Sequence, residues 1–371
     1  MPKPTVLIVH GMGQVDEEEF KNAFIADLKS TFSSYTKVKG ADPTDFANFE
    51  VIYYSDIFDE HREQLADRAR DLEERLSSLG DLDRNWVEEA AREISRVETE
   101  IDDDDFFKTH FLDVIYYRYT MLGERVRIRA AKKIAEAIQT HDAGSQGVHI
   151  IAHSLGTSVT HDTLANVYTG GVENEHLSAQ GHKLASVHFI ANVSRILESA
   201  VNVRQSVVKP GEYGCTNVFW QYRHEFDPFT LPRFFKPKRG EHWISDDLWD
   251  DGNYRLFEFS NILGDKSHPH ALCHFIANPD VHQSIIEQVL GQSLDSNEKT
   301  AAAEAYDEAS LSQRYEEFKD KFGDASISEL GSLKDLYDAA KELVDFVEDF
   351  ETDCGRQDAD DNAQEGEENE D

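Results

Sequence analysis

The sequence predicts an α/β protein with a doubly wound, mostly parallel sheet. Two short runs at residues 5–9 and 148–152 carry this prediction, because they are rich in Val, Leu and Ile and are as long as a buried strand. Stretches with helical periodicity separate the apolar runs, as crossover connections between parallel strands require. Further strands are expected at 49–54, 184–190, 215–222 and 254–259.

The 371 residues allow one large domain with additions. We expect a main domain over 1–292, a C-terminal helical region over 293–351 and a disordered acidic tail over 352–371. Residues 59–120 are long, polar and rich in helix-forming residues, beyond what a crossover needs. We interpret them as a helical insert that caps the domain, and a helical hairpin that contacts a partner is the alternative.

Composition narrows the classes of function. The net charge of −36 argues against nucleic-acid binding, because phosphate would be repelled. No apolar stretch reaches the roughly 18 residues of a membrane-spanning helix. The three cysteines lack metal or redox spacing, and the N-terminus runs into a strand without a signal-peptide pattern. These features predict a cytoplasmic protein without a transmembrane segment.

The sequence predicts a change from strand to helix at Ser154, which follows the apolar run 148–152 after one intervening residue, His153. The residues two before and two after the serine, Ala152 and Gly156, are small, as they must be where a strand and a helix nearly touch. This pattern is typical of a nucleophile elbow, a tight turn that presents a reactive serine. The backbone N–H of Leu155 would then face a developing oxyanion. An ordinary turn with an N-capping serine is the alternative.

A second glycine-bearing turn, His10-Gly11-Met12-Gly13, follows the first strand. A phosphate-binding turn is one interpretation, but neither glycine spacing of the known phosphate loops is present. A plain turn is another. We favour the second half of an oxyanion hole, in which the N–H of Met12 is the donor. His10 and Gly11 would shape this loop, and Gly156 would shape the elbow.

A serine nucleophile needs a base within hydrogen-bonding reach and a carboxylate that orients the base. Asp227 follows the strand expected at 215–222 and precedes a proline, which indicates a fixed loop. His270 follows the strand expected at 254–259. The chain therefore offers Ser154, Asp227 and His270 in the order serine, acid, histidine.

Three histidines lie close together at His268, His270 and His274. Such a cluster could instead bind zinc if two of them shared a helix face. Pro269 makes a helix at His268 unfavourable, and no matching carboxylate–histidine pair is evident. We therefore predict no metal site.

Four motifs resemble those of the lipase and carboxylesterase-like branch of the α/β-hydrolase superfamily. They are Val-His-Gly near the N-terminus, Ile-Ile-Ala-His-Ser-Leu-Gly-Thr, Phe-Asp-Pro, and His-Ala-Leu-Cys-His-Phe-Ile-Ala-Asn-Pro-Asp-Val. The resemblance covers residues 3–290 except the helices of the insert, with Ala152 in place of the first elbow glycine. It implies that Asp227 is the acid of a catalytic triad and His270 its base.

The expected function is that of a cytoplasmic serine hydrolase that cleaves a small-molecule or lipid ester without a metal or organic cofactor. The alternative is a non-catalytic protein that binds a partner through its helical insert and acidic C-terminal region. One apolar stripe at helical spacing lies in the C-terminal helices, and we expect it to dock on the main domain or on a second subunit, which would form a homo-oligomer. The stripe comprises Leu333, Leu336, Tyr337, Ala340, Leu343 and Val347.

Overall fold

A computed structural model describes the core of the chain. The described residues are 2–13, 16–61, 113–114, 116–118, 120–141, 147–170, 177–179, 181–194, 207–225, 227, 229–230, 235, 252–261, 263 and 269–309. Most of the expected insert at 59–120, and the C-terminal region and tail beyond 309, lie outside these residues. Among the described helices, none has both the length and the apolar character that crossing a bilayer would require.

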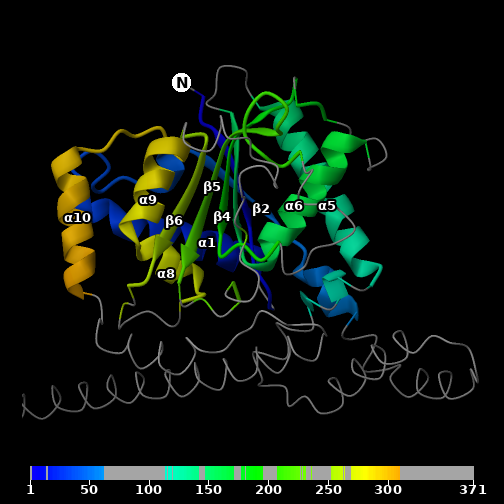
Figure 1. Cartoon of the computed structure of the whole chain (residues 1–371), viewed down its shortest axis with the longest axis horizontal. Helices are drawn as coiled ribbons and strands as arrows, with labels where there is room; N and C mark the ends of the chain where they lie inside the picture. The colour runs from blue at the N-terminus through cyan, green and yellow to red at the C-terminus, as the bar shows by residue number, and fades with distance from the viewer. Residues whose placement is uncertain are drawn as a thin grey trace, which may run out of the picture.

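Six strands form one sheet in the order β2-β1-β3-β4-β5-β6, and every neighbouring pair is parallel (Figure 1). The predicted α/β class is thereby confirmed, and the described sheet is wholly parallel. The strands are β1 (Thr5–Val9), β2 (Asn48–Ile52), β3 (Val148–His153), β4 (Leu184–Ile190), β5 (Thr216–His224) and β6 (Tyr254–Phe259).

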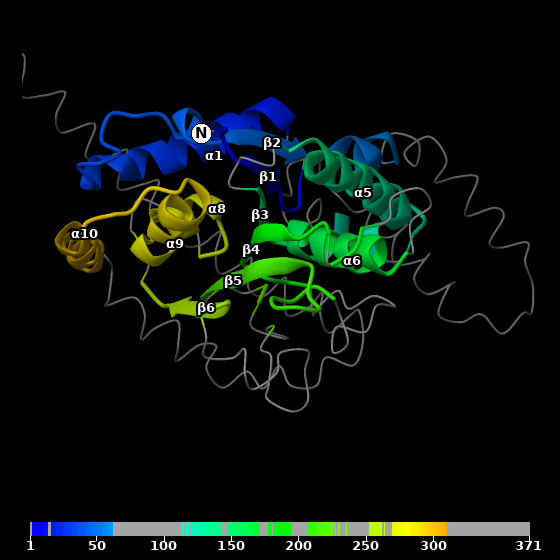
Figure 2. The ribbon, with the colours of Figure 1, turned by 90° about the horizontal axis from the view of Figure 1, so that it is seen from above.

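Helices cover both faces of the sheet (Figure 2). One face carries α5 (Leu122–Thr140) and α6 (Leu155–Thr169). The opposite face carries α1 (Glu17–Thr31), α8 (Leu272–Ala277) and α9 (Pro279–Ser284). Further described helical segments include two 3-10 turns (Phe32–Ser34 and Pro43–Asp45), a π-helical turn (Ile285–Val289) and α10 (Ser296–Ala309).

Alternation along β1 shows how a parallel strand is buried on both sides. Leu7 and Val9 belong to the apolar core beneath α5 and α6, whereas Val6 and Ile8 belong to the core beneath α1, α8 and α9. All four side chains are at most 1% exposed. A strand sandwiched between two helical layers must be apolar at every position, which explains its continuous run of Val, Leu and Ile.

The residues around its N-terminus explain where α1 begins. The Asp16 carboxylate caps the helix by accepting the backbone N–H groups of Glu18 and Glu19, at 2.9 and 3.0 Å. Acidic residues in the first turn also favour the positive end of the helix dipole. Phe24 and Leu28, one turn apart, fix the helix to the sheet because both are buried.

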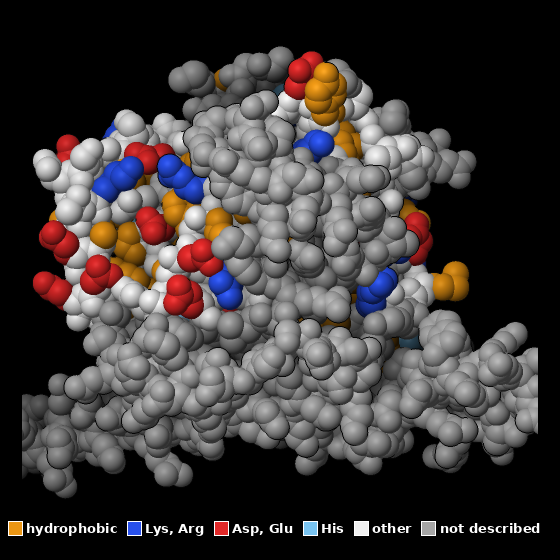
Figure 3. All heavy atoms as spheres, viewed as in Figure 1, with side chains coloured by type: hydrophobic (Ala, Val, Ile, Leu, Met, Phe, Trp, Pro, Cys, Tyr) orange, Lys and Arg blue, Asp and Glu red, His pale blue; other side chains and the backbone are white. Residues whose placement is uncertain are grey.

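Helix α10 packs beside α9 at one edge of the molecule, where acidic and basic side chains are interspersed on the surface (Figure 3). Lys299 Nζ lies 2.9 Å from Glu287 Oε2, and the Gln283 amide donates to the Lys299 carbonyl at 3.2 Å. The Tyr306 hydroxyl donates to the backbone carbonyl of Asn261 at 3.3 Å. These contacts tie the first helix of the expected C-terminal region to the main body.

Candidate active site

The site lies at the carboxyl ends of β1 and β3, which are neighbours in the sheet. From β1 the chain crosses to β2 on one side, and from β3 it proceeds to β4 on the other. A parallel sheet opens a crevice at such a switch point, and ligands of α/β proteins bind there. The turn with Ser154 and the turn with His10 and Gly11 therefore meet at the place where a binding site is expected.

Ser154 occupies a strained backbone conformation with φ 52° and ψ −125°, between the end of β3 and the start of α6. A β-carbon on Gly156 would lie 2.4 Å from the carbonyl oxygen of His10 and 2.8 Å from that of Val9. The first turn of α6 thus presses directly on the end of β1, so only glycine fits. Ala152 is fully buried on the strand side of the turn. The predicted turn from strand to helix at Ser154 is present, and its role as a nucleophile elbow stays a prediction.

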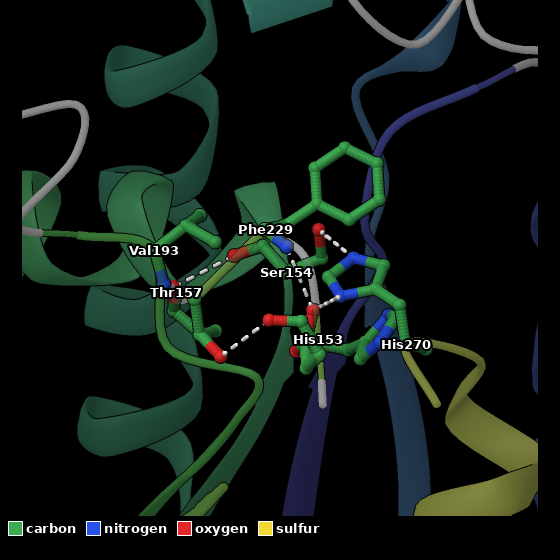
Figure 4. Close-up of polar contacts among 8 residues, drawn as sticks. His153, Ser154, Thr157, Val193, Phe229 and His270 are labelled. Atoms are coloured by element: carbon green, nitrogen blue, oxygen red, sulfur yellow. Dashed lines mark hydrogen bonds and ion pairs between the residues drawn. The ribbon is translucent and has the colours of Figure 1, made fainter. Parts of the chain in front are cut away.

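Hydrogen bonds hold the turn from both sides (Figure 4). The N–H of Ser154 donates to the Ile190 carbonyl at 3.0 Å. Thr157 donates its backbone N–H and its hydroxyl to the Ser154 carbonyl, at 2.8 and 2.7 Å. The N–H of Val193 in turn donates to the Thr157 hydroxyl oxygen at 3.1 Å. The strained turn is therefore fastened to the segment that follows β4, where Ala191 also has a positive φ of 50°.

The structure brings the three predicted residues Ser154, Asp227 and His270 together. His270 Nε2 lies 2.7 Å from Ser154 Oγ, and His270 Nδ1 lies 2.9 Å from Asp227 Oδ1. Because a carboxylate only accepts, Nδ1 carries the proton in this pair and Nε2 can accept the serine O–H. The serine follows β3, the aspartate follows β5, and the histidine precedes α8. Figure 4 shows His270 beside Ser154.

Asp227 is fully buried, and this burial by itself would raise the pKa of its carboxyl. The neighbouring His270 and the hydrogen bonds from His270 and from the N–H of Phe229, at 3.0 Å, outweigh burial and lower the pKa. The carboxylate therefore remains ionised at neutral pH and can stabilise a positive charge on the imidazole. The ring of Phe229 lies against that imidazole, with ring centroids 4.4 Å apart.

The turn after β1 is held rigidly against the serine. His10 Nδ1 donates to the Gly11 carbonyl at 2.9 Å, and its Nε2 accepts the N–H of Tyr54 at 3.3 Å. Burial lowers the pKa of His10 to about 4, so this ring is neutral near pH 7. A β-carbon on Gly11 would lie 3.0 Å from Ser154 Cβ. His10 and Gly11 thus lie in the loop beside Ser154, and their part in an oxyanion loop stays a prediction.

The two predicted oxyanion donors, Met12 and Leu155, both lie next to the nucleophile. Leu155 follows Ser154 as the first residue of α6, and its side chain is fully buried. Met12 follows Gly11, which is in contact distance of the serine. Their role as donors stays a prediction.

The sequence did not reveal Asp113 as part of this loop. Asp113 Oδ2 accepts the N–H of Gly13 at 2.8 Å, and the Ser55 hydroxyl donates to the Gly13 carbonyl at 3.3 Å. Asp113 is 1% exposed. A hydrogen bond across 100 residues leaves no local pattern, and Asp113 was included in the expected insert. This carboxylate instead helps to fix the loop that carries Met12.

The clustered histidines that the structure describes have different hydrogen-bond partners. His270 bonds to Ser154 and Asp227, whereas His274 Nε2 donates to the Asn261 carbonyl at 3.1 Å. His268 lies outside the described residues. Within the part of the chain that the structure describes, no three or more His, Cys, Asp or Glu side chains are grouped to hold a metal ion.

Comparisons of the chain with models of protein families, with curated proteins and with solved structures gave no match. A functional assignment therefore depends on the chemistry of the side chains at the switch point. There a strained serine, an imidazole and a buried carboxylate form one hydrogen-bonded chain beside a glycine-containing loop. Such an arrangement can activate a hydroxyl group as a nucleophile.

Proposed function

We propose that the protein is a serine hydrolase that cleaves a carboxylic ester, of the lipase and carboxylesterase type. The observation that carries the proposal is the continuous hydrogen-bonded chain from Asp227 through His270 to Ser154, at 2.9 and 2.7 Å. A serine that merely capped a helix would need neither a strained φ nor an imidazole on its hydroxyl. A buried carboxylate behind that imidazole is the third element of a catalytic triad.

In the proposed reaction, Ser154 Oγ attacks the ester carbonyl carbon while His270 Nε2 takes the hydroxyl proton. Asp227 holds the imidazole through Nδ1 and stabilises its protonated form. The tetrahedral intermediate collapses when the C–O bond to the alcohol breaks and His270 returns the proton to the leaving oxygen. A water molecule, deprotonated by His270, then hydrolyses the acyl-enzyme and frees the carboxylic acid and Ser154.

The negative oxygen of the intermediate would be stabilised by backbone N–H groups. Leu155 stands at the N-terminus of α6, where the helix dipole also favours negative charge. Met12 would supply the second N–H from the loop after β1. Removal of one such donor in serine hydrolases typically costs about 100- to 1000-fold in turnover.

The proposed reaction needs no metal or organic cofactor, because the three side chains and water carry out every proton transfer and every bond change. The same steps would cleave thioesters or amides. The preference for acyl chain and leaving group is therefore to be measured by assay. We place the protein in the cytoplasm and take the substrate to be a small-molecule or lipid ester. The net negative charge of the chain argues against nucleic acid as a partner, because its phosphates would be repelled.

The alternative of a non-catalytic, partner-binding protein rests on the helical insert and the acidic C-terminal region. Both lie mostly outside the described residues, as does the apolar stripe proposed to form a homo-oligomer. A binding protein would gain nothing from an activated serine. The complete triad geometry therefore favours the enzyme.

A fluorophosphonate probe tests the proposal, because it reacts with activated serines. We expect stoichiometric labelling that peptide mass spectrometry locates to Ser154, and none in Ser154→Ala. Hydrolysis of p-nitrophenyl esters of increasing chain length would then define the acyl preference. The proposal fails if Ser154→Ala turns over esters as fast as the wild-type protein, or if the wild-type protein neither reacts with the probe nor hydrolyses any ester.

A further inference from the structure

The residue before the nucleophile binds the backbone of the base. His153 Nε2 lies 2.8 Å from the carbonyl oxygen of His270. Because a carbonyl only accepts, the ring N–H of His153 is the donor. Figure 4 shows both imidazoles beside Ser154, with His153 on the strand side. The nucleophile and the base are thus linked twice, once through their side chains and once through this hydrogen bond.

The His153 ring is confined on several sides. Its centroid lies 5.1 Å from that of His270 and 6.3 Å from that of Phe275 on α8. A β-carbon on Gly11 would come within 3.2 Å of His153 Nδ1. The ring therefore fills the space between the loop after β1, the turn that carries His270 and the start of α8.

We propose that His153 is a positioning residue that sets the distance between His270 Nε2 and Ser154 Oγ. This inference rests on the proposed function. Ser154 is fixed locally by the elbow, but His270 arrives 116 residues later in a turn before α8. A hydrogen bond from the residue adjacent to the serine to the histidine's own carbonyl transfers the rigidity of β3 to the base. The hydrogen bond of His153 reaches the backbone of His270, so we assign its effect to the position of that residue.

The expected effect follows from the geometric tolerance of catalysis. A base must be held within about 0.5 Å of its productive position. A misplacement of about 1 Å can cost roughly 100-fold in rate. Loss of the His153 hydrogen bond should therefore lower kcat and leave substrate affinity almost unchanged.

Two substitutions separate the hydrogen bond from the space that the ring fills. His153→Phe keeps a planar ring of similar size and removes the donor, whereas His153→Gln keeps an N–H donor. With p-nitrophenyl acetate, we expect kcat to fall about 10- to 100-fold in His153→Phe with KM within about twofold. His153→Gln should recover most of the loss. His141→Phe is the matched control, because His141 also donates a ring N–H to a carbonyl, that of Ile138, at the end of α5.

A double-mutant cycle distinguishes positioning from a merely structural role. If His153 acts through the base, His153→Phe should not further reduce the residual turnover of a His270→Ala variant. A general loss of folded protein would reduce turnover by the same factor in both backgrounds, and that result would overturn the inference. So would an active wild-type enzyme whose kcat is unchanged in His153→Phe. If the wild-type protein has neither probe labelling nor esterase activity, the proposed function fails, and the positioning role fails with it.

Discussion

Gly156 is a residue at which the fold leaves no room for a side chain. An added methyl group would meet the backbone oxygens of His10 and Val9 at 2.4 and 2.8 Å, and backbone cannot rotate away as a side chain can. We expect Gly156→Ala to destabilise the protein by about 1–3 kcal/mol or more, as overpacking does, and to abolish probe labelling of Ser154. Thermal unfolding and labelling measure the two effects. Gly181→Ala is the control, since its methyl group would meet only the Ser178 hydroxyl at 3.2 Å. Equal melting temperatures for the two variants would contradict the prediction.

Asp227 allows a second prediction at this scale. Its lowered pKa means that it acts as an ionised carboxylate, so the isosteric Asp227→Asn removes the charge and allows the wrong tautomer of His270. We expect kcat to fall by about 10³- to 10⁴-fold, with KM much less affected. Steady-state kinetics with p-nitrophenyl acetate measure this loss. A decrease of less than tenfold would show that Asp227 does not orient the base.

Among the elements, β4 carries a buried polar network that joins three strands. His188 Nδ1 lies 2.9 Å from the Tyr222 hydroxyl on β5, and its Nε2 lies 2.9 Å from Ser186 Oγ. Ser186 Oγ also lies 2.7 Å from His149 Nδ1 on β3. Each imidazole here is enclosed by the sheet and the helices over it, so a charged ring would be poorly solvated.

This network makes the protein sensitive to acid. Burial, aided by the nearby His149, lowers the pKa of His188 from 6.5 to about 3. Below about pH 6 the unfolded chain therefore binds one proton more than the folded one, and the stabilisation present above pH 6.5 is lost as the pH falls toward 3. We expect His188→Gln to reduce the slope of unfolding free energy against pH by about 1.4 kcal/mol per unit between pH 6 and 4. Urea unfolding at several pH values measures this slope. The difference in unfolding free energy between the variant and the wild-type protein at pH 7.5 gives the effect of lost packing. An unchanged slope would refute the prediction.

Helix α10 supports the ends of two other elements. The Asn261 carbonyl that Tyr306 contacts also accepts ring N–H groups from His224 at the end of β5 and His274 on α8, both at 3.1 Å. Asp227 follows the first of these histidines by three residues, and His270 precedes the second by four. Loss of α10 should therefore loosen the segments that carry the acid and the base.

Truncation tests this support. We expect a chain that ends at residue 295 to melt several degrees below one that ends at residue 309 and to have a lower kcat, because only the longer chain contains α10. A chain that ends at residue 352 is the control and should match the full-length protein, since the segment it lacks is almost free of apolar residues. Identical melting temperatures and kcat for the two shorter chains would exclude the proposed support.

The strands illustrate what can be predicted from local pattern. The strands expected at 184–190 and 254–259 have those bounds in the structure, because their turns are marked in the sequence. The strand expected at 49–54 ends at Ile52. Its last predicted residue, Tyr54, instead gives its N–H to His10 and its hydroxyl to two carbonyls of the loop after β1. A long-range contact thus overrides a β-favouring sequence.

In the candidate site too, local patterns could be read from the sequence and long-range contacts could not. The turn at Ser154 could be predicted because its signal lies within nine residues. Asp227 and His270 could be proposed from their order along the chain and from the resemblance of the motifs around them. The hydrogen bonds of His153 and Asp113 could not, since they join residues 117 and 100 positions apart. With 73 acidic residues in the chain, nothing in its sequence distinguishes the one carboxylate that reaches Gly13.

On the scale of the whole molecule, the net charge of −36 should oppose compaction. Salt shortens the range of this repulsion from about 30 Å at 0.01 M to about 3 Å at 1 M. We therefore expect the melting temperature to rise by several degrees between 10 mM and 1 M NaCl, with KCl giving the same shift because screening does not depend on the ion. Differential scanning calorimetry measures the shift, and a constant or falling melting temperature would contradict the prediction.

The distances along the chain within the triad also bear on the order of folding. The hydrogen bond from His270 to Ser154 spans 116 residues, and the one to Asp227 spans 43. During synthesis the elbow emerges well before the histidine, so a nascent chain would carry the strained serine without its base. Parallel sheets with such non-local pairings fold slowly. The proposed esterase activity would therefore arise only after β6 and α8 have docked, and turnover would then be a measure of completed folding.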